Sequence, residues 1–335
     1  MDGLGKEGRR EKEGVRVTES MKRVIVTGAN GFVGKWLLKE LGREGVQVTA
    51  VVRSRDADLS EIRCLAHVQV LFCDMAQLSR LPKMINGQYD TFYHLAWSGS
   101  TGDLRGDYGM QLENARWTCQ AVEAAHAVGC TRFVGAGTLA ELDVQAYVAQ
   151  DGTKPAQTMN YGTAKIAAHY MSKAVCQAVG IQHVWAYLPN LYGEGNQTSN
   201  FVNFAAKTML SGKEANFTSG EQLYDFVYIS DAARALCLLG EKGRDGYSYY
   251  IGSNAAKKLK YFIMQIKDAV HPQIRLHLGA VPFCGVAQEP QVFDCKKLME
   301  HTGYLPQVSF EEGIQRTVAW LRLQMEEQGS NHAEI

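Results

Sequence analysis

The chain has 335 residues, and its 35 lysines and arginines balance 35 aspartates and glutamates, so the formal net charge is zero. Without an excess of either charge there is no broad field to concentrate a polyanion, which argues against a nucleic-acid partner. The eight cysteines are scattered singly, and none forms a pair or cluster with zinc spacing, so we predict no metal site and a reducing, cytoplasmic environment. No apolar run approaches the roughly 20 residues of a membrane span, so no membrane partner is expected.

The two ends of the chain differ in composition from the rest. Residues 1–20 are dominated by glycine and charged side chains, with few apolar ones. Such a segment cannot bury enough apolar surface to offset the entropy of ordering, and it is predicted to be a disordered leader. Residues 326–335 are polar and are predicted to form a flexible tail.

From Lys22 onward, short apolar β-branched runs alternate with amphipathic stretches, which is the pattern of parallel strands joined by helices. Right-handed crossovers then give an α/β fold, a Rossmann-type doubly wound parallel sheet over residues 21–190. Strands are predicted at 23–27, 47–52, 68–73, 91–95, 132–136 and 183–188, and helices at 34–42, 111–128 and 162–179.

After Pro189 the alternation loosens, and residues 191–325 are predicted to form mainly a smaller C-terminal substrate-binding lobe. Extended runs are expected at 222–229 and 249–252. Ser309 and Glu312 have the spacing of a capping box ahead of an apolar stripe, which predicts a closing helix packed on the body. We expect this helix to fray after Gln324.

The first strand runs directly into the sequence TGANGFVG and then into the helical KWLLKEL. A glycine motif between a strand and a helix is typical of dinucleotide binding. Gly28 would permit the tight turn, Gly31 would let a pyrophosphate approach the helix N-terminus, and Gly34 would allow close helix–sheet packing. The alternative is an ordinary glycine-rich turn.

The residues after the second and third strands bear on the choice of cofactor. An NAD-preferring enzyme usually carries an acidic residue where this chain has Val52, and the next residue is Arg53. Because an arginine pairs well with a 2′-phosphate, NADP is favoured over NAD, with a merely solvated Arg53 as the alternative. Asp74 and Met75 follow the third strand, where the carboxylate would accept from the adenine amino group or simply form a strand-end turn.

The sequence YGTAK places Tyr161 and Lys165 four residues apart on a predicted helix, and therefore on one face of it. A nearby ammonium favours the phenolate, so we expect Lys165 to lower the pKa of Tyr161 from about 10 toward working pH. Tyr161 would then serve as a general acid or base. Thr138, at the end of the preceding strand, would hydrogen-bond the reacting oxygen.

With these residues in place, the chain resembles the extended short-chain dehydrogenases/reductases of the nucleotide-sugar epimerase, dehydratase and reductase group, from about Met21 to the terminal helix. The residues that carry the resemblance are TGANGFVG, Asp74, HLA at 94–96, Asn114, Thr138, Tyr161 with Lys165, LPNLYGEG at 188–195 and YDFVYISDAARAL at 224–236.

The resemblance implies a role for each matching residue. Asn114 would brace the active site, Lys165 would also hold the nicotinamide ribose, and Asn190 would contact the substrate. The implied cofactor-binding residues are Gly28, Asn30, Gly31, Phe32, Val33, Gly34, Arg53, Asp74, Met75, Leu95, Ala96, Tyr161, Lys165 and Leu188.

Departures from the family pattern narrow the reaction. The 4,6-dehydratases place an Asp-Glu pair directly after the catalytic threonine, where this chain has Leu139 and Ala140, so dehydration is not expected. Glu141 is interpreted as a structural acid at a helix start. Two arginines that the family often uses are replaced by Tyr187 and Tyr224. A substitute for the diphosphate clamp would have to come from Lys207, Lys213 or Arg275.

The sequence therefore predicts an NAD(P)-dependent oxidoreductase acting on a nucleotide-activated sugar, with 4-keto reduction favoured over C4 epimerisation. Two alternatives stay open. One is an NADPH-dependent reductase of a small ketone or aldehyde, and the other is a non-catalytic dinucleotide-binding regulatory protein. A homodimer is predicted, because the helices at 111–128 and 162–179 carry apolar residues on more than one face. Packing of those faces under loops of the same chain is the alternative.

Overall fold

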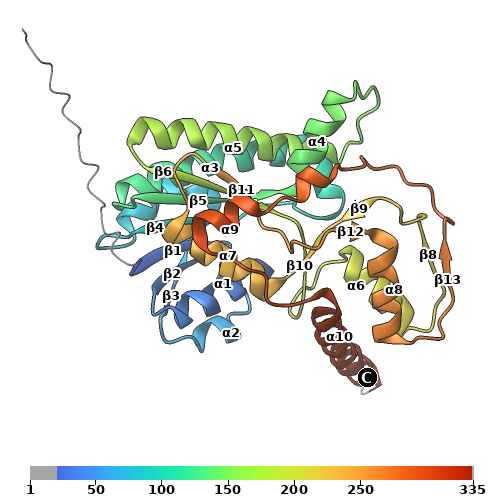
Figure 1. Cartoon of the computed structure of the whole chain (residues 1–335). Coiled ribbons are helices and arrows are strands. Elements are labelled where there is room, and N and C mark those ends of the chain that lie inside the picture. Colours follow the sequence, from blue (N-terminus) through green and yellow to red (C-terminus); the bar gives the residue numbers. More distant parts are fainter. Residues whose placement is uncertain (1–20, 334–335) are drawn as a thin grey trace, which may run out of the picture.

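The computed structural model describes the backbone of residues 21–333 and the side chains of residues 21–327 (Figure 1). The predicted leader at 1–20 lies outside the described residues. No helix in the described range is both long enough and apolar enough to cross a membrane.

A seven-stranded sheet, parallel throughout, forms the centre of the molecule, with the strand order β11-β6-β5-β4-β1-β2-β3. The chain runs from β1 outward through β2 to β3 at one edge and then crosses back to β4, so the direction of strand order reverses between β1 and β4. Ligands of such sheets bind at the carboxyl ends beside this reversal. The predicted Rossmann-type α/β fold is confirmed. The strands are β1 (Arg23–Thr27), β2 (Gln47–Val52), β3 (Val68–Phe72), β4 (Thr91–His94), β5 (Arg132–Thr138), β6 (Gln182–Leu188) and β11 (Ser248–Tyr250).

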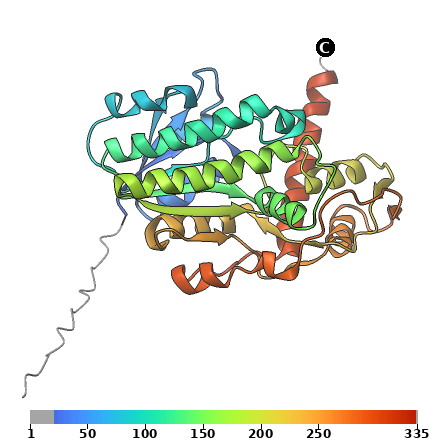
Figure 2. The ribbon, with the colours of Figure 1, turned by 90° about the horizontal axis from the view of Figure 1, so that it is seen from above.

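Helices cover both faces of this sheet because its strands are apolar on both sides. In β1, Val24 and Val26 point into one core and Ile25 into the other, and all three are fully buried. Figure 1 shows one helical layer above the sheet and one below, and Figure 2 shows α3 and α5 side by side. The helices of this part are α1 (Phe32–Arg43), α2 (Ser60–Arg63), η1 (Met75–Lys83), η2 (Gly102–Gly106), α3 (Tyr108–Ala127), α4 (Leu139–Ala149), α5 (Met159–Val179), α7 (Ile229–Lys242) and α9 (Lys296–Thr302).

The smaller lobe has a core of its own, in which the rings of Phe226, Phe262 and Phe310 contact one another. It lies beyond the carboxyl ends of the strands, on the right of Figure 1. Its elements are β7 (Asn190–Tyr192), α6 (Phe201–Leu210), β8 (Ala215–Phe217), β9 (Leu223–Tyr224), β10 (Phe226–Tyr228), β12 (Lys257–Lys258), α8 (Leu259–Val270), β13 (Leu276–Leu278) and α10 (Phe310–Ala333). The short helix η3 (Pro290–Phe293) instead packs on β11, through the contact of Phe293 with Tyr250.

One sequence prediction about the C-terminal half is wrong. The run at 249–252 was assigned to the smaller lobe, but Ser248–Tyr250 forms β11 and pairs with β6 at the edge of the main sheet. Hydrophobicity alone does not reveal which sheet a short strand joins. The closing helix, α10, runs from Phe310 through Ala333, so its backbone is helical beyond Gln324, where fraying was predicted. Its predicted start is confirmed, since the Glu312 N–H donates to Ser309 Oγ at 3.2 Å.

Candidate active site

The turn between β1 and α1 has the backbone geometry that a dinucleotide requires. Gly28 has φ +67°, and a Cβ there would lie 2.7 Å from the Ala96 nitrogen. A Cβ at Gly34 would lie 2.3 Å from the Gly28 carbonyl oxygen, so only glycine lets α1 approach the turn this closely. No side chain caps α1 at Gly31, which leaves the first N–H groups of the helix for an anion.

A cavity of about 650 Å³ opens beside this turn at the carboxyl ends of the strands, and we name it the glycine-turn cavity. The uncapped helix start on its wall fits a pyrophosphate, and the residues around it would hold a nicotinamide dinucleotide. The predicted cofactor residues that line it are Gly28, Asn30, Gly31, Phe32, Val33, Gly34, Arg53, Met75, Leu95, Ala96, Tyr161 and Leu188.

Asp74 and Lys165 are predicted cofactor residues that do not line this cavity. The Asp74 carboxylate accepts from the Ala76 N–H at 2.9 Å and caps η1. Of the two roles considered for Asp74 from the sequence, this contact corresponds to the strand-end turn and not to adenine binding. Arg53 is exposed at the end of β2 and lines the cavity.

A second cavity, of about 910 Å³, lies between α4 and the loop at 283–288. Thr138 and Tyr161 line both cavities and so form a shared wall. Asn190 also faces both. Lys207, Lys213 and Arg275 line neither cavity, so they do not provide the expected substitute for the missing arginines. The polar and aromatic side chains that line the second cavity include Arg105, Asp143, Tyr147, Lys154, Tyr224 and Gln288.

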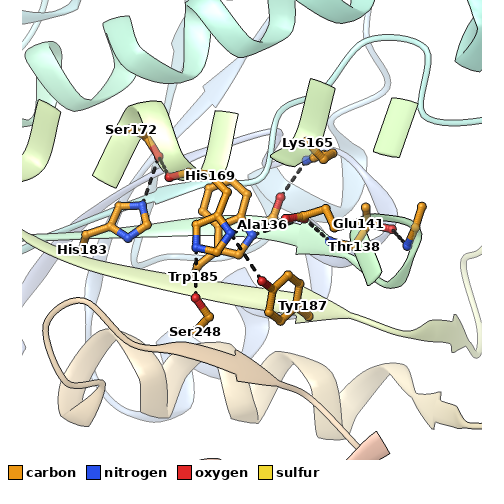
Figure 3. Close-up of polar contacts among 11 residues, drawn as sticks. Ala136, Thr138, Glu141, Lys165, His169, Ser172, His183, Trp185, Tyr187 and Ser248 are labelled. Carbon is orange, nitrogen blue, oxygen red and sulfur yellow. Dashed lines mark hydrogen bonds and ion pairs between the residues drawn. The ribbon is translucent and has the colours of Figure 1, made fainter. Parts of the chain in front are cut away.

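The predicted effect of Lys165 on Tyr161 is not what the structure shows. Lys165 Nζ donates to the Ala136 carbonyl at 2.6 Å (Figure 3) and lies 3.8 Å from the centre of the Trp97 ring. Burial lowers the pKa of Lys165 to about 7. For Tyr161, burial raises the pKa above its ordinary value, while a hydrogen bond from Thr138 and the charge of Arg105 lower it. The expectation that Lys165 lowers the pKa of Tyr161 is therefore wrong here, because burial dominates and the ammonium is engaged elsewhere.

Two neighbours of Tyr161 carried no sequence signal. The Trp97 ring meets Tyr161 edge to face at 6.0 Å, and its Nε1–H donates to Gln111 Oε1 at 2.8 Å. The Arg105 guanidinium lies over the Tyr161 ring, 4.7 Å from its centre. Both come from the segment between β4 and α3, which belongs to no motif.

Asn114 has the bracing role that the resemblance implies. Its Oδ1 accepts from the Ser98 N–H and its Nδ2 donates to the Ser98 carbonyl, each at 2.9 Å. These bonds tie α3 to the loop that carries Trp97. His94 is a buried strand residue 2.9 Å from Thr27 Oγ1, and burial lowers its pKa to about 3, so it stays neutral.

A buried polar network lies behind the shared wall (Figure 3). Glu141 is fully buried, and its Oε1 accepts from the Thr138 N–H at 2.9 Å and from Trp185 Nε1–H at 3.2 Å. Its Oε2 lies 3.4 Å from His169 Nδ1, and His169 Nε2 lies 2.9 Å from Ser248 Oγ. The prediction of a structural acid at a helix start is confirmed, because Thr138 and Glu141 form a capping box for α4. The network also connects β5, β6, α5 and β11.

Comparison with known proteins identifies relatives and structural neighbours of the chain. It is 26% identical to dTDP-glucose 4,6-dehydratase 1 of Escherichia coli K12, over 89% of this chain and 92% of that protein. The fold resembles UDP-glucose 4-epimerase of Thermotoga maritima, solved with UDP-glucose, with a TM-score of 0.76 and 20% identity over 90% of this chain and 99% of that one. It also resembles the Bordetella bronchiseptica enzyme WbmF, solved with NADH, with a TM-score of 0.74 and 20% identity over 92% and 94% of the two chains. The model of the NAD dependent epimerase/dehydratase family matches residues 24–252, more than half of the chain. The chain therefore belongs to the NAD dependent epimerase/dehydratase family.

Proposed function

We propose that this protein is an NAD(P)-dependent oxidoreductase that acts on a nucleotide-activated sugar, by 4-keto reduction or by C4 epimerisation. The observation that carries the proposal is the shared wall: Thr138 and Tyr161 face the glycine-turn cavity on one side and the second cavity on the other. A hydroxyl pair in that place can act on a substrate carbon that lies beside a bound nicotinamide. The dTDP-glucose and UDP-glucose enzymes among the similar proteins support a sugar nucleotide as the substrate.

The chemistry assigned to this chain is proton transfer at the sugar C4 oxygen. Nicotinamide, when bound, supplies or accepts the hydride. In reduction, Tyr161 gives its phenol proton to the oxygen of the 4-keto group while C4 gains hydride, so the ketone becomes an alcohol. Thr138 orients the same oxygen by a hydrogen bond. Regeneration of the phenol then takes one proton from solvent.

Dehydration is not part of the proposal, although several similar proteins are named dehydratases. Leu139 and Ala140 follow Thr138 and line the second cavity, where they offer no acid or base. Glu141 is committed to the buried network and lines neither cavity. The same wall therefore favours a reaction that moves hydride and a proton without removing water.

NADP is the proposed cofactor, and with it net reduction is favoured over epimerisation. Arg53 lines the glycine-turn cavity, and no carboxylate stands at Val52 to repel a 2′-phosphate. Mass spectrometry of the purified protein distinguishes the two reactions. A dissociable coenzyme and an empty site are expected for the reductase, whereas stoichiometric NAD that stays bound identifies an epimerase.

Tyr161→Phe tests the proposal directly. Loss of the general acid is expected to lower turnover of a nucleotide 4-keto sugar by about 100-fold or more, with dinucleotide affinity near normal. Coenzyme absorbance measures the first quantity and calorimetry the second. Undiminished turnover in the variant removes Tyr161 from the mechanism. Turnover of simple ketones or aldehydes in place of sugar nucleotides supports the small-carbonyl reductase instead, and tight dinucleotide binding without turnover of any carbonyl supports a regulatory role.

We also propose a homodimer formed through α3 and α5. Tyr108 and Leu112 on α3 and Tyr170 and Met171 on α5 are each more than half exposed. Large apolar side chains gathered on two adjacent helices are typical of an interface. Light scattering on the native protein is expected to give twice the chain mass, and Leu112→Asp combined with Tyr170→Asp is expected to give the monomer. A native monomer contradicts the proposal.

A further inference from the structure

Arg105 is a cation without an ion-pair partner next to the shared wall. Its guanidinium carbon lies 4.7 Å from the centre of the Tyr161 ring, and its side chain lines the second cavity. Within the described part of the chain it forms no salt bridge, and its buried Nε has no hydrogen-bond acceptor.

Several other groups act on Tyr161. Lys165, one turn further along α5, is held by the Ala136 carbonyl and the Trp97 ring. Glu141 on α4 is the negative charge that opposes the phenolate, and Thr138 donates a hydrogen bond. Asp143, also on α4, faces Arg105 and is itself bound by Gln288. Arg105 is the cation whose charge acts on Tyr161 directly, against the effect of Glu141.

We propose that Arg105 is a positioning residue that stabilises the phenolate of Tyr161 from the face of its ring. The inference rests on the proposed function for its catalytic meaning, because phenolate charge develops when Tyr161 gives its proton to the substrate oxygen. An arginine stays charged throughout the pH range in which a phenol titrates. Arg105 therefore adds a positive charge from a segment other than the helix that carries Lys165.

Ionisation of Tyr161 itself is the quantity to measure, because it does not depend on any substrate. Replacing tyrosine by 3-fluorotyrosine throughout the protein lowers each phenol pKa by induction and gives each residue a ¹⁹F resonance. The resonance that Tyr161→Phe removes is assigned to position 161. Titrations then compare the native chain with Arg105→Gln, Arg105→Met and Arg105→Lys. Arg43→Gln is the matched control, because it removes the same charge from an exposed site at the end of α1.

Loss of the charge in Arg105→Gln and Arg105→Met is expected to move the midpoint of residue 161 to higher pH, since an opposite charge at this range favours the ionised form. Arg105→Lys is expected to restore part of the shift, and Arg43→Gln to cause none. With a nucleotide 4-keto sugar, kcat/KM of Arg105→Gln is expected to fall by about tenfold with KM nearly unchanged.

A midpoint unchanged in both uncharged variants overturns the proposal. So does a rise in KM with an unchanged midpoint, which would identify Arg105 as a ligand of an anionic substrate group. If the midpoint shifts but no sugar nucleotide is turned over, the proposed function fails while the electrostatic role of Arg105 stands. The titration and the assay therefore separate the two failures.

Discussion

The glycine-turn cavity and the second cavity share Thr138 and Tyr161 but are built in different ways. One wall of the first is a continuous turn, whose backbone geometry depends on Gly28 and Gly34. The second is bounded by side chains from η2, α4, β9 and the loop at 283–288, which are far apart in the sequence. Backbone geometry tolerates few residue types, whereas a wall of side chains can be assembled in many ways. The comparison explains why one cavity is recognised in the sequence and the other is not.

Gly34→Val should disrupt the turn that bounds the glycine-turn cavity, and it is expected to have the largest effect of these variants, a loss of dinucleotide affinity. A Cβ at this position would lie 2.3 Å from the Gly28 oxygen and 2.7 Å from the Ala29 oxygen, so α1 must move away from the turn. Loss of two or three charge-assisted hydrogen bonds to a pyrophosphate corresponds to about 4 kcal/mol, or about 1,000-fold in dinucleotide affinity. Calorimetric titration measures it. Gly109→Ala, where the nearest contact would be 3.4 Å away, is the control, and native affinity in Gly34→Val would contradict the pyrophosphate assignment.

Glu141→Leu tests how much the buried polar network behind Thr138 contributes to the stability of the protein. The variant leaves the Thr138 N–H and the Trp185 indole N–H without their acceptor. Breaking a buried polar network of this kind is expected to lower the free energy of unfolding by about 3 kcal/mol, as measured in urea. Glu141→Gln keeps an acceptor and is expected to lose about 1 kcal/mol. Equal stability of the two variants would show that the carboxylate does not hold the wall.

Lys165→Met tests whether burial of the lysine behind the shared wall makes the stability of the protein depend on pH. The pKa of Lys165 is lowered to about 7 from 10.5, so between these values the unfolded chain binds a proton that the folded chain does not. The free energy of unfolding therefore rises with pH across this window, and the penalty is constant below it. Relative to Lys165→Met, the native protein is expected to gain about 2 kcal/mol between about pH 7.5 and about pH 9.5. The free energies of unfolding are measured in urea at both pH values. The same difference between native protein and variant at the two pH values would disprove this burial effect.

Arg53→Gln is expected to have the smallest effect, because the residue is exposed at the rim of the glycine-turn cavity. Loss of its pairing with a 2′-phosphate should weaken NADP binding by about tenfold and leave NAD binding unchanged. The dissociation constants of both coenzymes decide the question. Arg55→Gln is the control, since its guanidinium lies over the Phe72 ring, 4.7 Å from the centre. Equal weakening of both coenzymes would rule out the phosphate contact.

Much of the main sheet could be predicted because its strands are buried on both faces and read as continuous apolar runs. The predicted bounds of β1 and β2 agree with the structure, and β5 extends two residues further, which brings Thr138 to the strand end. The strand β11 was assigned to the wrong part of the molecule, because the sequence of a short strand does not indicate which strand it pairs with. The motifs also predicted that Thr138 and Tyr161 would face the same cavity. They did not predict the position of the Lys165 ammonium, because a lysine side chain has many rotamers.

By itself, the sequence determined the Rossmann-type sheet, the glycine turn and the identity of the hydroxyl pair, because each depends on local backbone conformation or on a short repeat distance. Only the tertiary structure decided which charges surround Tyr161. Arg105, Trp97, Glu141 and Lys165 come from three segments, and their electrostatic effects depend on distances and burial that no local pattern encodes. Coulomb interactions and desolvation act through space, so the properties of the phenol are set by the folded chain as a whole.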